Sequence, residues 1–251
     1  MIIPPRPKAR DHKAGLQTLQ RRLLLRGGLS IGALTLLTGC NLEDDDDAVD
    51  RLLTRISRMN DRAQAALFSG SRLAPEYQEA DITDPFPFNA YYPEERAPTI
   101  DGGNWRLELG GMIGDRTPWT LAQLHALPSV SQITRHICIE GWSAVGQWGG
   151  VRLSDFLQRI GADTRAQYIS FSCADDYSTS IDMATALHPQ TILATTFRGA
   201  TLPRAYGFPI KLRVPTKLGF KNPKYIVAMT VTNEYPGGFW EKYGYNWFSG
   251  L

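Results

Sequence analysis

One cysteine of this chain lies in a segment whose residue types could do chemistry. The segment reads Arg135-His136-Ile137-Cys138-Ile139-Glu140-Gly141-Trp142-Ser143. Cys138 has no nearby second cysteine for a zinc site, a Cys-x-x-Cys pair or a disulfide, so its thiol is placed to do chemistry rather than to fill a core. If strand geometry persisted through residue 140, the side chains of His136, Cys138 and Glu140 would point to one face. A thiol, an imidazole and a carboxyl group would then meet at one site.

The elements around this segment indicate a mixed fold. The apolar run at 130–139 predicts a strand that ends in a Gly-rich turn, and 153–160 predicts a short amphipathic helix. Further strands are predicted at 105–113, 166–173, 192–198, 210–214 and 225–232, short helices at 119–127 and 182–187, and a longer amphipathic helix at 48–68. This irregular order favours an α+β domain over repeated βαβ units.

Composition and charge limit the function classes. The chain has 251 residues, of which 43% are hydrophobic, so it can bury a substantial core. Residues 1–39 hold seven Lys or Arg and one acid, whereas the remainder holds 20 basic and 24 acidic residues. A mildly acidic body carries no nucleic-acid footprint, and we expect no nucleic-acid partner.

The basic start predicts a targeting segment. Arg21-Arg22 and the following residues resemble a twin-arginine export signal, and Leu37-Thr38-Gly39-Cys40 resembles a bacterial lipobox. We therefore expect a signal at 1–39, an acidic spacer and helix at 40–69, and a catalytic domain at 70–251. The protein would be periplasmic and anchored to a membrane by a lipid on Cys40. The alternative is a chance cysteine after a conventional cleavage site.

Three separated stretches resemble the molybdopterin-binding domain of the sulfite oxidase family, in its bacterial periplasmic branch. They lie at 138–153 (Cys-x-Glu-x-Trp-Ser, then Trp-Gly-Gly-Val), at 188–194, and at 202–224 (Gly-x-Pro, then Pro-x-Lys-x-Gly-Phe-Lys). The resemblance implies a mixed-sheet fold of the sulfite oxidase type, without the C-terminal immunoglobulin-like dimerisation domain. It also implies a molybdenum–molybdopterin cofactor, to which the pterin supplies a dithiolene and the protein one cysteine.

The resemblance assigns roles to the residues of the first segment. Cys138 would ligate the molybdenum as a thiolate, which suits a soft metal site and which cationic surroundings would favour. Glu140 would line the active site as a proton relay; its alternative role is a salt bridge to Arg135 or Arg152. His136 would contact substrate or serve as a hydrogen-bonded structural histidine.

The resemblance also assigns pterin contacts, which are Asn89, Tyr92, Cys173, Lys211, Asn222 and Lys224. Lys224 and the backbone near Asn222 would hold the pterin phosphate, while Lys221 is either a further phosphate contact or a surface residue. Asn89 could otherwise be a turn residue. Three positions depart from the family pattern, namely Tyr206, Lys211 in place of an arginine, and Cys173 in place of a threonine. These departures leave individual pterin contacts and the substrate open.

The expected function is oxygen-atom transfer at a Cys-ligated molybdenum, reducing an S-oxide, with methionine sulfoxide in proteins as the first candidate. Oxidation of sulfite or a related small oxyanion is the alternative. Two other classes stay open: a non-catalytic lipoprotein that keeps the fold as a binding module, and a nucleophile enzyme using Cys138 with His136. The sequence has no covalent-haem motif and no iron–sulfur spacing. Electrons would therefore come from a separate redox protein, such as a membrane haem protein.

Overall fold

The computed structural model describes residues 46–68 and 70–251, and within these residues 57–251 form one compact unit. Helix α2 (Asp46–Leu67) leads into this unit and agrees with the helix predicted at 48–68. The predicted export signal and the candidate lipid site at Cys40 lie outside the described residues. In the described part of the chain, no helix has the length and apolar character needed to cross a membrane.

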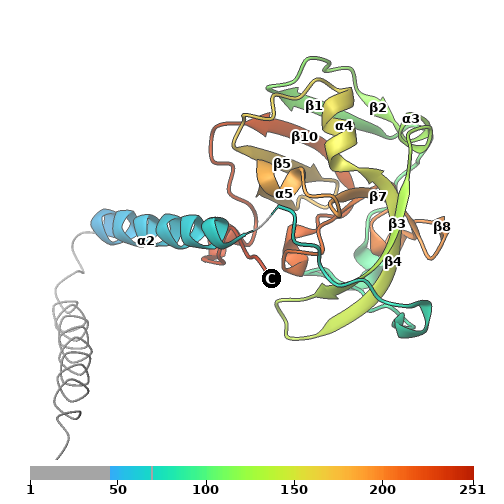
Figure 1. Cartoon of the computed structure of the whole chain (residues 1–251), viewed down its shortest axis with the longest axis horizontal. Coiled ribbons are helices and arrows are strands. Elements are labelled where there is room, and N and C mark those ends of the chain that lie inside the picture. Colours follow the sequence, from blue (N-terminus) through green and yellow to red (C-terminus); the bar gives the residue numbers. More distant parts are fainter. Residues whose placement is uncertain (1–45, 69) are drawn as a thin grey trace, which may run out of the picture. The chain divides into compact units, whose positions relative to one another are not determined.

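The first of two sheets has the strand order β2-β1-β10-β5-β6. Its strands are β1 (Arg106–Gly111), β2 (Trp119–Thr120), β5 (Tyr168–Cys173), β6 (Ser178–Asp182) and β10 (Ile226–Thr232). Strand β1 pairs with β10 in parallel, and the other pairs are antiparallel. Figure 1 shows β1, β10 and β5 side by side. The sheet is therefore mixed, which confirms the expected α+β class.

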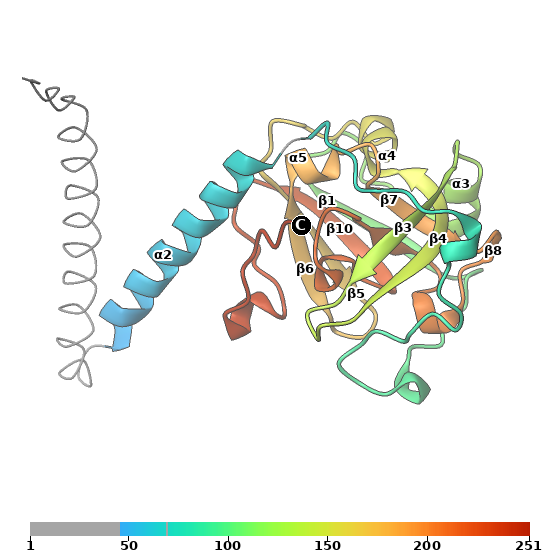
Figure 2. The same cartoon turned by 60° about the horizontal axis from the view of Figure 1, so that its bottom comes forward.

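The second sheet carries the segment with the cysteine. Strands β3 (Val130–Ile137) and β4 (Ser143–Arg152) form a long antiparallel hairpin, and β4 pairs with β7 (Ile192–Phe197). The two-residue strand β8 (Ala200–Thr201) and β9 (Lys211–Arg213) both pair with β7. Figure 2 shows β3 and β4 running together across the body. Cys138 therefore lies in the connection that closes this hairpin.

Short helices cover the sheets and complete the core. They are α3 (Leu121–His125), α4 (Leu153–Arg159) and α5 (Met183–Ala186). Thr120 caps α3, since its side chain accepts a hydrogen bond from the backbone of Gln123. The larger core cluster joins the apolar faces of the first sheet to α4 through residues such as Leu107, Phe156 and Phe171. A smaller cluster surrounds Trp148 and Phe86 behind the second sheet.

Strand β4 was not expected, because its glycines predict a turn. These glycines lie within the strand, and the pairing register between β4 and β7 shifts between Gly149 and Gly150. A Cβ atom on Gly150 would overlap the backbone carbonyl oxygen of Leu193, so the two strands approach closely only because the side chain is absent. Strand β6 was also missed, since its sequence Ser-Thr-Ser-Ile-Asp is mostly polar although its middle residues are buried.

The close approach at Gly150 predicts a large stability loss for Gly150→Ala. The added methyl group would push β4 from β7, and we expect the free energy of unfolding to fall by at least about 2 kcal/mol. Urea unfolding measures the change. Gly70→Ala is the matched control, because a Cβ atom there meets open space. An equal effect of both substitutions would contradict the packing argument.

Candidate active site

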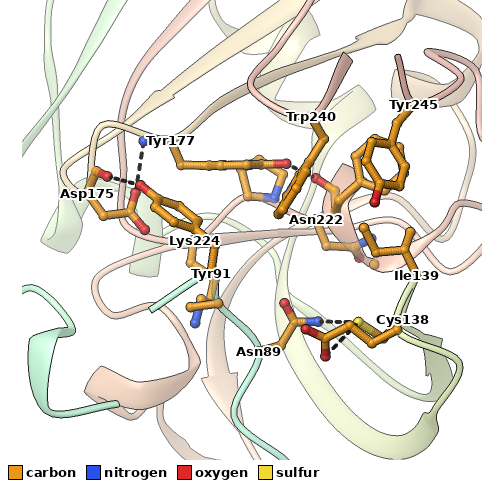
Figure 3. A pocket seen from close by; sticks show the side chains of 15 residues that line it. Asn89, Tyr91, Cys138, Ile139, Asp175, Tyr177, Asn222, Lys224, Trp240 and Tyr245 are labelled. Carbon is orange, nitrogen blue, oxygen red and sulfur yellow. Dashed lines mark hydrogen bonds between the residues drawn. The ribbon is translucent and has the colours of Figure 1, made fainter. Parts of the chain in front are cut away.

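A tight turn after β3 presents Cys138. The Cys138 backbone N–H donates to the Trp142 carbonyl at 2.9 Å, and the Gly141 N–H donates to the Cys138 carbonyl at 3.2 Å. Gly141 has a φ of 91°, a conformation that favours glycine. Cys138 is 8% exposed and lies in the wall of a cavity of about 450 Å³ (Figure 3).

Two polar side chains form hydrogen bonds with the Cys138 sulfur, one from a residue earlier in the chain and one from a residue just after Cys138. The Asn89 amide donates to Sγ at 3.6 Å, and Sγ donates to Glu140 Oε2 at 3.7 Å. Asn89 Nδ2 also lies 2.8 Å from His136 Nε2. Glu140 and Asn89 therefore reach the Cys138 sulfur directly, whereas His136 is linked to it through the Asn89 amide. The turn, rather than an extended strand, brings Glu140 there.

Glu140 is fixed by a neighbour rather than by a distant cation. Its Oε2 accepts a hydrogen bond from Trp142 Nε1 at 2.9 Å. Among the ion pairs of the described residues, none joins Glu140 to Arg135 or Arg152. The salt bridge considered as its alternative role is therefore not formed, and its carboxylate faces the cavity.

The electrostatics of the site differ from the sequence expectation. Burial raises the pKa of the Cys138 thiol, and the nearby Glu140 carboxylate raises it further. The expected cationic surroundings are thus wrong for the sulfur itself. Burial lowers the pKa of His136, and the charges of Lys211, Arg213 and Lys224 lower it further. His136 is therefore neutral, and the unbound thiol stays protonated near neutral pH.

The segment that carries Asn89 is tied to the loop after β5. Tyr92 OH donates to Asp175 Oδ2 at 2.6 Å, and Tyr91 OH donates to the Asp175 carbonyl at 2.7 Å. Tyr91 lines the cavity, whereas Tyr92 lies behind it. Tyr92 thus holds the segment in place through Asp175, and its predicted pterin contact stays a prediction.

Two of the buried lysines have no carboxylate partner. Lys224 lines the cavity, donates to the Ala205 carbonyl at 3.2 Å, and has its pKa lowered to about 8 by burial. Lys211 is 2% exposed, and its Nζ lies 4.5 Å from the centroid of the Trp148 ring. Neither forms an ion pair with another described residue. Lys224 is therefore an unpaired cation of the cavity wall, whereas Lys211 is not among the residues that line the cavity.

Two other lysines of the same loop are already paired inside the protein. Lys221 is 1% exposed and forms a short ion pair with Glu241, so its interpretation as a surface residue is wrong. Lys217 lies 3.4 Å from Asp182 and packs over the Phe248 ring. Both ammonium groups already face carboxylates inside the protein, and we exclude them as free phosphate contacts.

Asn222 and Cys173 have mainly structural surroundings. Asn222 Oδ1 accepts hydrogen bonds from Arg213 Nη1 at 3.0 Å and from the Val214 backbone at 2.8 Å. Its side chain is therefore used internally, although the residue lines the cavity. Cys173 is 6% exposed in the main core cluster, and burial raises the pKa of its thiol. Its predicted pterin contact stays untested.

The sequence prediction missed the aromatic and acidic wall of the cavity. Figure 3 shows Tyr91, Trp240 and Tyr245 around the opening, with Cys138 and Asn89 on the other side. The other aromatic and acidic wall residues that were missed are Asp175, Tyr177 and Phe220. Trp240 and Tyr245 come from the tail after β10. Their ring centroids lie 5.3 Å apart. The density of Trp and Tyr in 236–251 was the available signal.

Comparisons with known proteins identify the family of the chain. A family model described as the oxidoreductase molybdopterin binding domain matches residues 94–240. A relative from Azospira oryzae, provisionally named protein-methionine-sulfoxide reductase subunit YedZ1, is 56% identical over 92% of this chain and 87% of its own. The protein-methionine-sulfoxide reductase catalytic subunit MsrP of Xanthomonas axonopodis is 31% identical, over 68% of this chain and 60% of its own length.

A solved structure adds a likeness of fold alone. The sulfane dehydrogenase SoxCD from Paracoccus pantotrophus superposes with a TM-score of 0.52 at 18% identity. The match covers 55% of this chain and 40% of that chain.

The burial of Lys217 predicts a pH-dependent stability. Burial lowers its pKa in the folded state to about 7, from 10.5, so the unfolded chain binds the extra proton between these values. Its destabilising effect is fully present below pH 7 and is relieved as the pH rises. We expect Lys217→Met to remove a rise of up to about 1.4 kcal/mol per pH unit in this window.

Urea unfolding between about pH 6 and pH 10 measures this difference. The exposed Lys242 gives the control variant Lys242→Met, which should keep the pH profile of the unsubstituted protein. Parallel profiles for all three proteins would contradict the assignment to Lys217.

Proposed function

The chain belongs to the family of the oxidoreductase molybdopterin binding domain, and we propose that it reduces the S-oxides of thioethers at a molybdenum held by Cys138. The net reaction takes one S-oxide, two protons and two electrons to a thioether and water. The observation that carries this proposal is the placement of Cys138 in an aromatic cavity, with Asn89 and Glu140 at its sulfur.

The donor set of the cavity fits a molybdenum–pterin cofactor. Within the described residues, no three His, Cys, Asp or Glu side chains gather as a metal site, so the protein offers one thiol and the pterin must supply the other soft donors. Lys224 and Lys211, which lack carboxylate partners, suit an anionic phosphate. The buried Nδ1 of His136 also has no partner within the protein.

When bound, the cofactor supplies two-electron oxygen-atom exchange at the metal. Cys138 would hold the metal as a thiolate, although the pKa of its unbound thiol is raised. Asn89 would keep its hydrogen bond to the sulfur while the neutral His136 accepts from the same amide group. Glu140, kept in place by Trp142, would hold or release a proton at the cavity side of the sulfur.

The lining of the cavity favours an uncharged S-oxide over sulfite. Its charged side chains are two carboxylates, Glu140 and Asp175, and one ammonium group, Lys224. A small dianion would meet like charges there, which costs binding energy in a half-enclosed site. Tyr91, Trp240 and Tyr245 offer ring edges and faces that attract thioether sulfur. The names of both methionine-sulfoxide reductase relatives support the same substrate class.

The proposal includes the source of the electrons and the cellular location of the protein. The sequence has no covalent-haem motif and no iron–sulfur spacing, so a separate redox protein, such as a membrane haem protein, would deliver the electrons. The twin-arginine and lipobox patterns support export to the periplasm and a lipid on Cys40.

The other function classes have weaker support. A nucleophile enzyme would need Cys138 as a thiolate beside a basic imidazole, whereas burial raises the thiol pKa and lowers that of His136. Asn89 also lies within hydrogen-bonding distance of both groups rather than orienting the far side of the imidazole. A non-catalytic binding module is disfavoured because the matching family model describes an oxidoreductase domain.

A turnover assay tests the proposal. Protein from a molybdenum-replete host, with a reduced viologen dye as the electron donor, should oxidise the dye when a methionine-sulfoxide peptide or dimethyl sulfoxide is added. With ferricyanide as the acceptor, sulfite turnover should be at least about tenfold slower. Faster sulfite turnover would reverse the proposed direction. Fewer than about one molybdenum per ten chains, with no turnover, would favour the binding module.

Replacing the ligand gives a sharper test. Cys138→Ser substitutes a hard oxygen for a soft sulfur, and we expect sulfoxide turnover to fall by at least about 100-fold, because replacing even a residue that only hydrogen-bonds to a metal ligand can cost that much. Metal analysis and absorption of the thiolate-to-metal band measure the ligand directly. Cys173→Ser, in the core, is the matched control and should keep the band. An unchanged band in Cys138→Ser would contradict the assignment.

A further inference from the structure

Helix α2 contacts the body of the protein through its polar side. Asp61 is 6% exposed, and its Oδ1 accepts hydrogen bonds from Asn246 Nδ2 at 2.8 Å and from the Phe248 backbone at 3.2 Å. The Arg58 guanidinium stacks over the Tyr235 ring. On the same part of the helix, Met59 is 61% exposed. This is the reverse of the usual arrangement, in which a surface helix buries its apolar stripe.

The exposed apolar stripe continues toward the start of the helix. Leu52, Leu53 and Ile56 precede Met59 by seven, six and three residues, which places all four on one face. They are 58%, 57%, 42% and 61% exposed in that order. Leu67, eight residues beyond Met59, is 87% exposed on the same side. The stripe therefore runs along most of the helix.

A row of arginines borders this stripe on one side. Arg51, Arg55 and Arg62 follow the helical period and are exposed, and none forms an ion pair with another described residue. The acids whose side chains are described, Asp50 and Asp61, lie on the other side of the helix, away from the stripe. Apolar residues bordered by free arginines are typical of helices that lie in a membrane interface.

We propose that α2 lies on an anionic phospholipid surface, with the stripe of Leu52, Leu53, Ile56 and Met59 inserted at headgroup depth. Arg51, Arg55 and Arg62 would then contact lipid phosphates, because their long side chains can reach out from the apolar face. The helix cannot cross the bilayer, which leaves an in-plane position. Five residues separate Cys40 from the helix start, so a lipid there would hold α2 near the same surface.

A second copy of the chain is a less suitable occupant. Val49, Leu52, Ile56 and Met59 alternate at three and four residues as in a coiled coil, but Leu53 widens the apolar face beyond such a narrow seam. In a parallel pair the flanking positions would place Arg55 and Arg62 opposite Asn60 and Leu67, so no interhelical ion pair would form.

Site-directed spin labelling tests the proposal on the full chain loaded with its cofactor. Single nitroxides are placed at 52, 56 or 59 on the stripe, and at 54 or 57 on other faces, in a Cys40→Ser, Cys173→Ser background. Vesicles contain phosphatidylglycerol and phosphatidylethanolamine, with pure phosphatidylcholine as the control. We expect oxygen accessibility on anionic vesicles to be at least about threefold higher at the stripe positions. We expect the affinity for anionic vesicles to fall at least about tenfold in the triple variant Arg51→Gln, Arg55→Gln, Arg62→Gln.

Three outcomes would overturn the proposal. Equal water exposure of all five labels on vesicles means that α2 does not insert, even if another segment binds lipid. Spin–spin broadening between labels at 56 without lipid means that a second copy covers the stripe. Equal insertion into phosphatidylcholine, unaffected by the arginine substitutions, removes the anionic partner. Because every protein carries Cys40→Ser, the result is independent of lipid attachment, and sulfoxide turnover is measured separately.

Discussion

The guanidinium group of Arg213 joins the chain segments from which the site is built. It is fully buried and donates to Thr134 Oγ1, to the Arg135 carbonyl and to Asn222 Oδ1. A buried cation is stable only when its donors are satisfied, so these three acceptors cannot move independently. The end of β3, strand β9 and the loop at 214–224 are thereby fixed against one another. The turn at Cys138 starts three residues after that hydrogen bond to Arg135.

The same constraint divides the other buried cations into two kinds. Lys217 and Lys221 face the carboxylates of Asp182 and Glu241 and hold the loop and tail to the body. Lys211 and Lys224 form no ion pair with another described residue, and each lowers the pKa of His136. Burial of like charges destabilises the protein until an anion arrives. Cofactor phosphate would therefore stabilise the fold as well as bind to it.

The sequence predicted those elements whose apolar residues repeat at the spacing of a strand or a helix, and the site segment with a distinctive motif. The strand before Cys138 and the helix at 153–160 follow from apolar spacing, and the cofactor family follows from Cys138 with its Glu140 and Trp142 neighbours. Strand β4 could not be predicted, because Gly149 and Gly150 weaken a strand unless another backbone comes close. The sequence also could not predict which of Lys217, Lys221 and Lys224 pair with a carboxylate. Lys217 and Lys221 pair with acids 35 and 20 residues away in sequence, whereas Lys224 forms no ion pair with a described residue.

The two sides of the cavity come from different parts of the chain. One side is made by the hairpin turn at Cys138 and by the loop ending at Lys224, whose positions are fixed by backbone pairing and by Arg213. The other side is made by the tail after β10, which is held by the Glu241 ion pair and by Phe239 stacking on Tyr91 at 4.7 Å. Changes in the tail can therefore alter what the cavity accepts without moving Cys138. This separation explains why the motif around Cys138 identifies the chemistry, while the substrate has to be inferred from Trp240, Tyr245 and their neighbours.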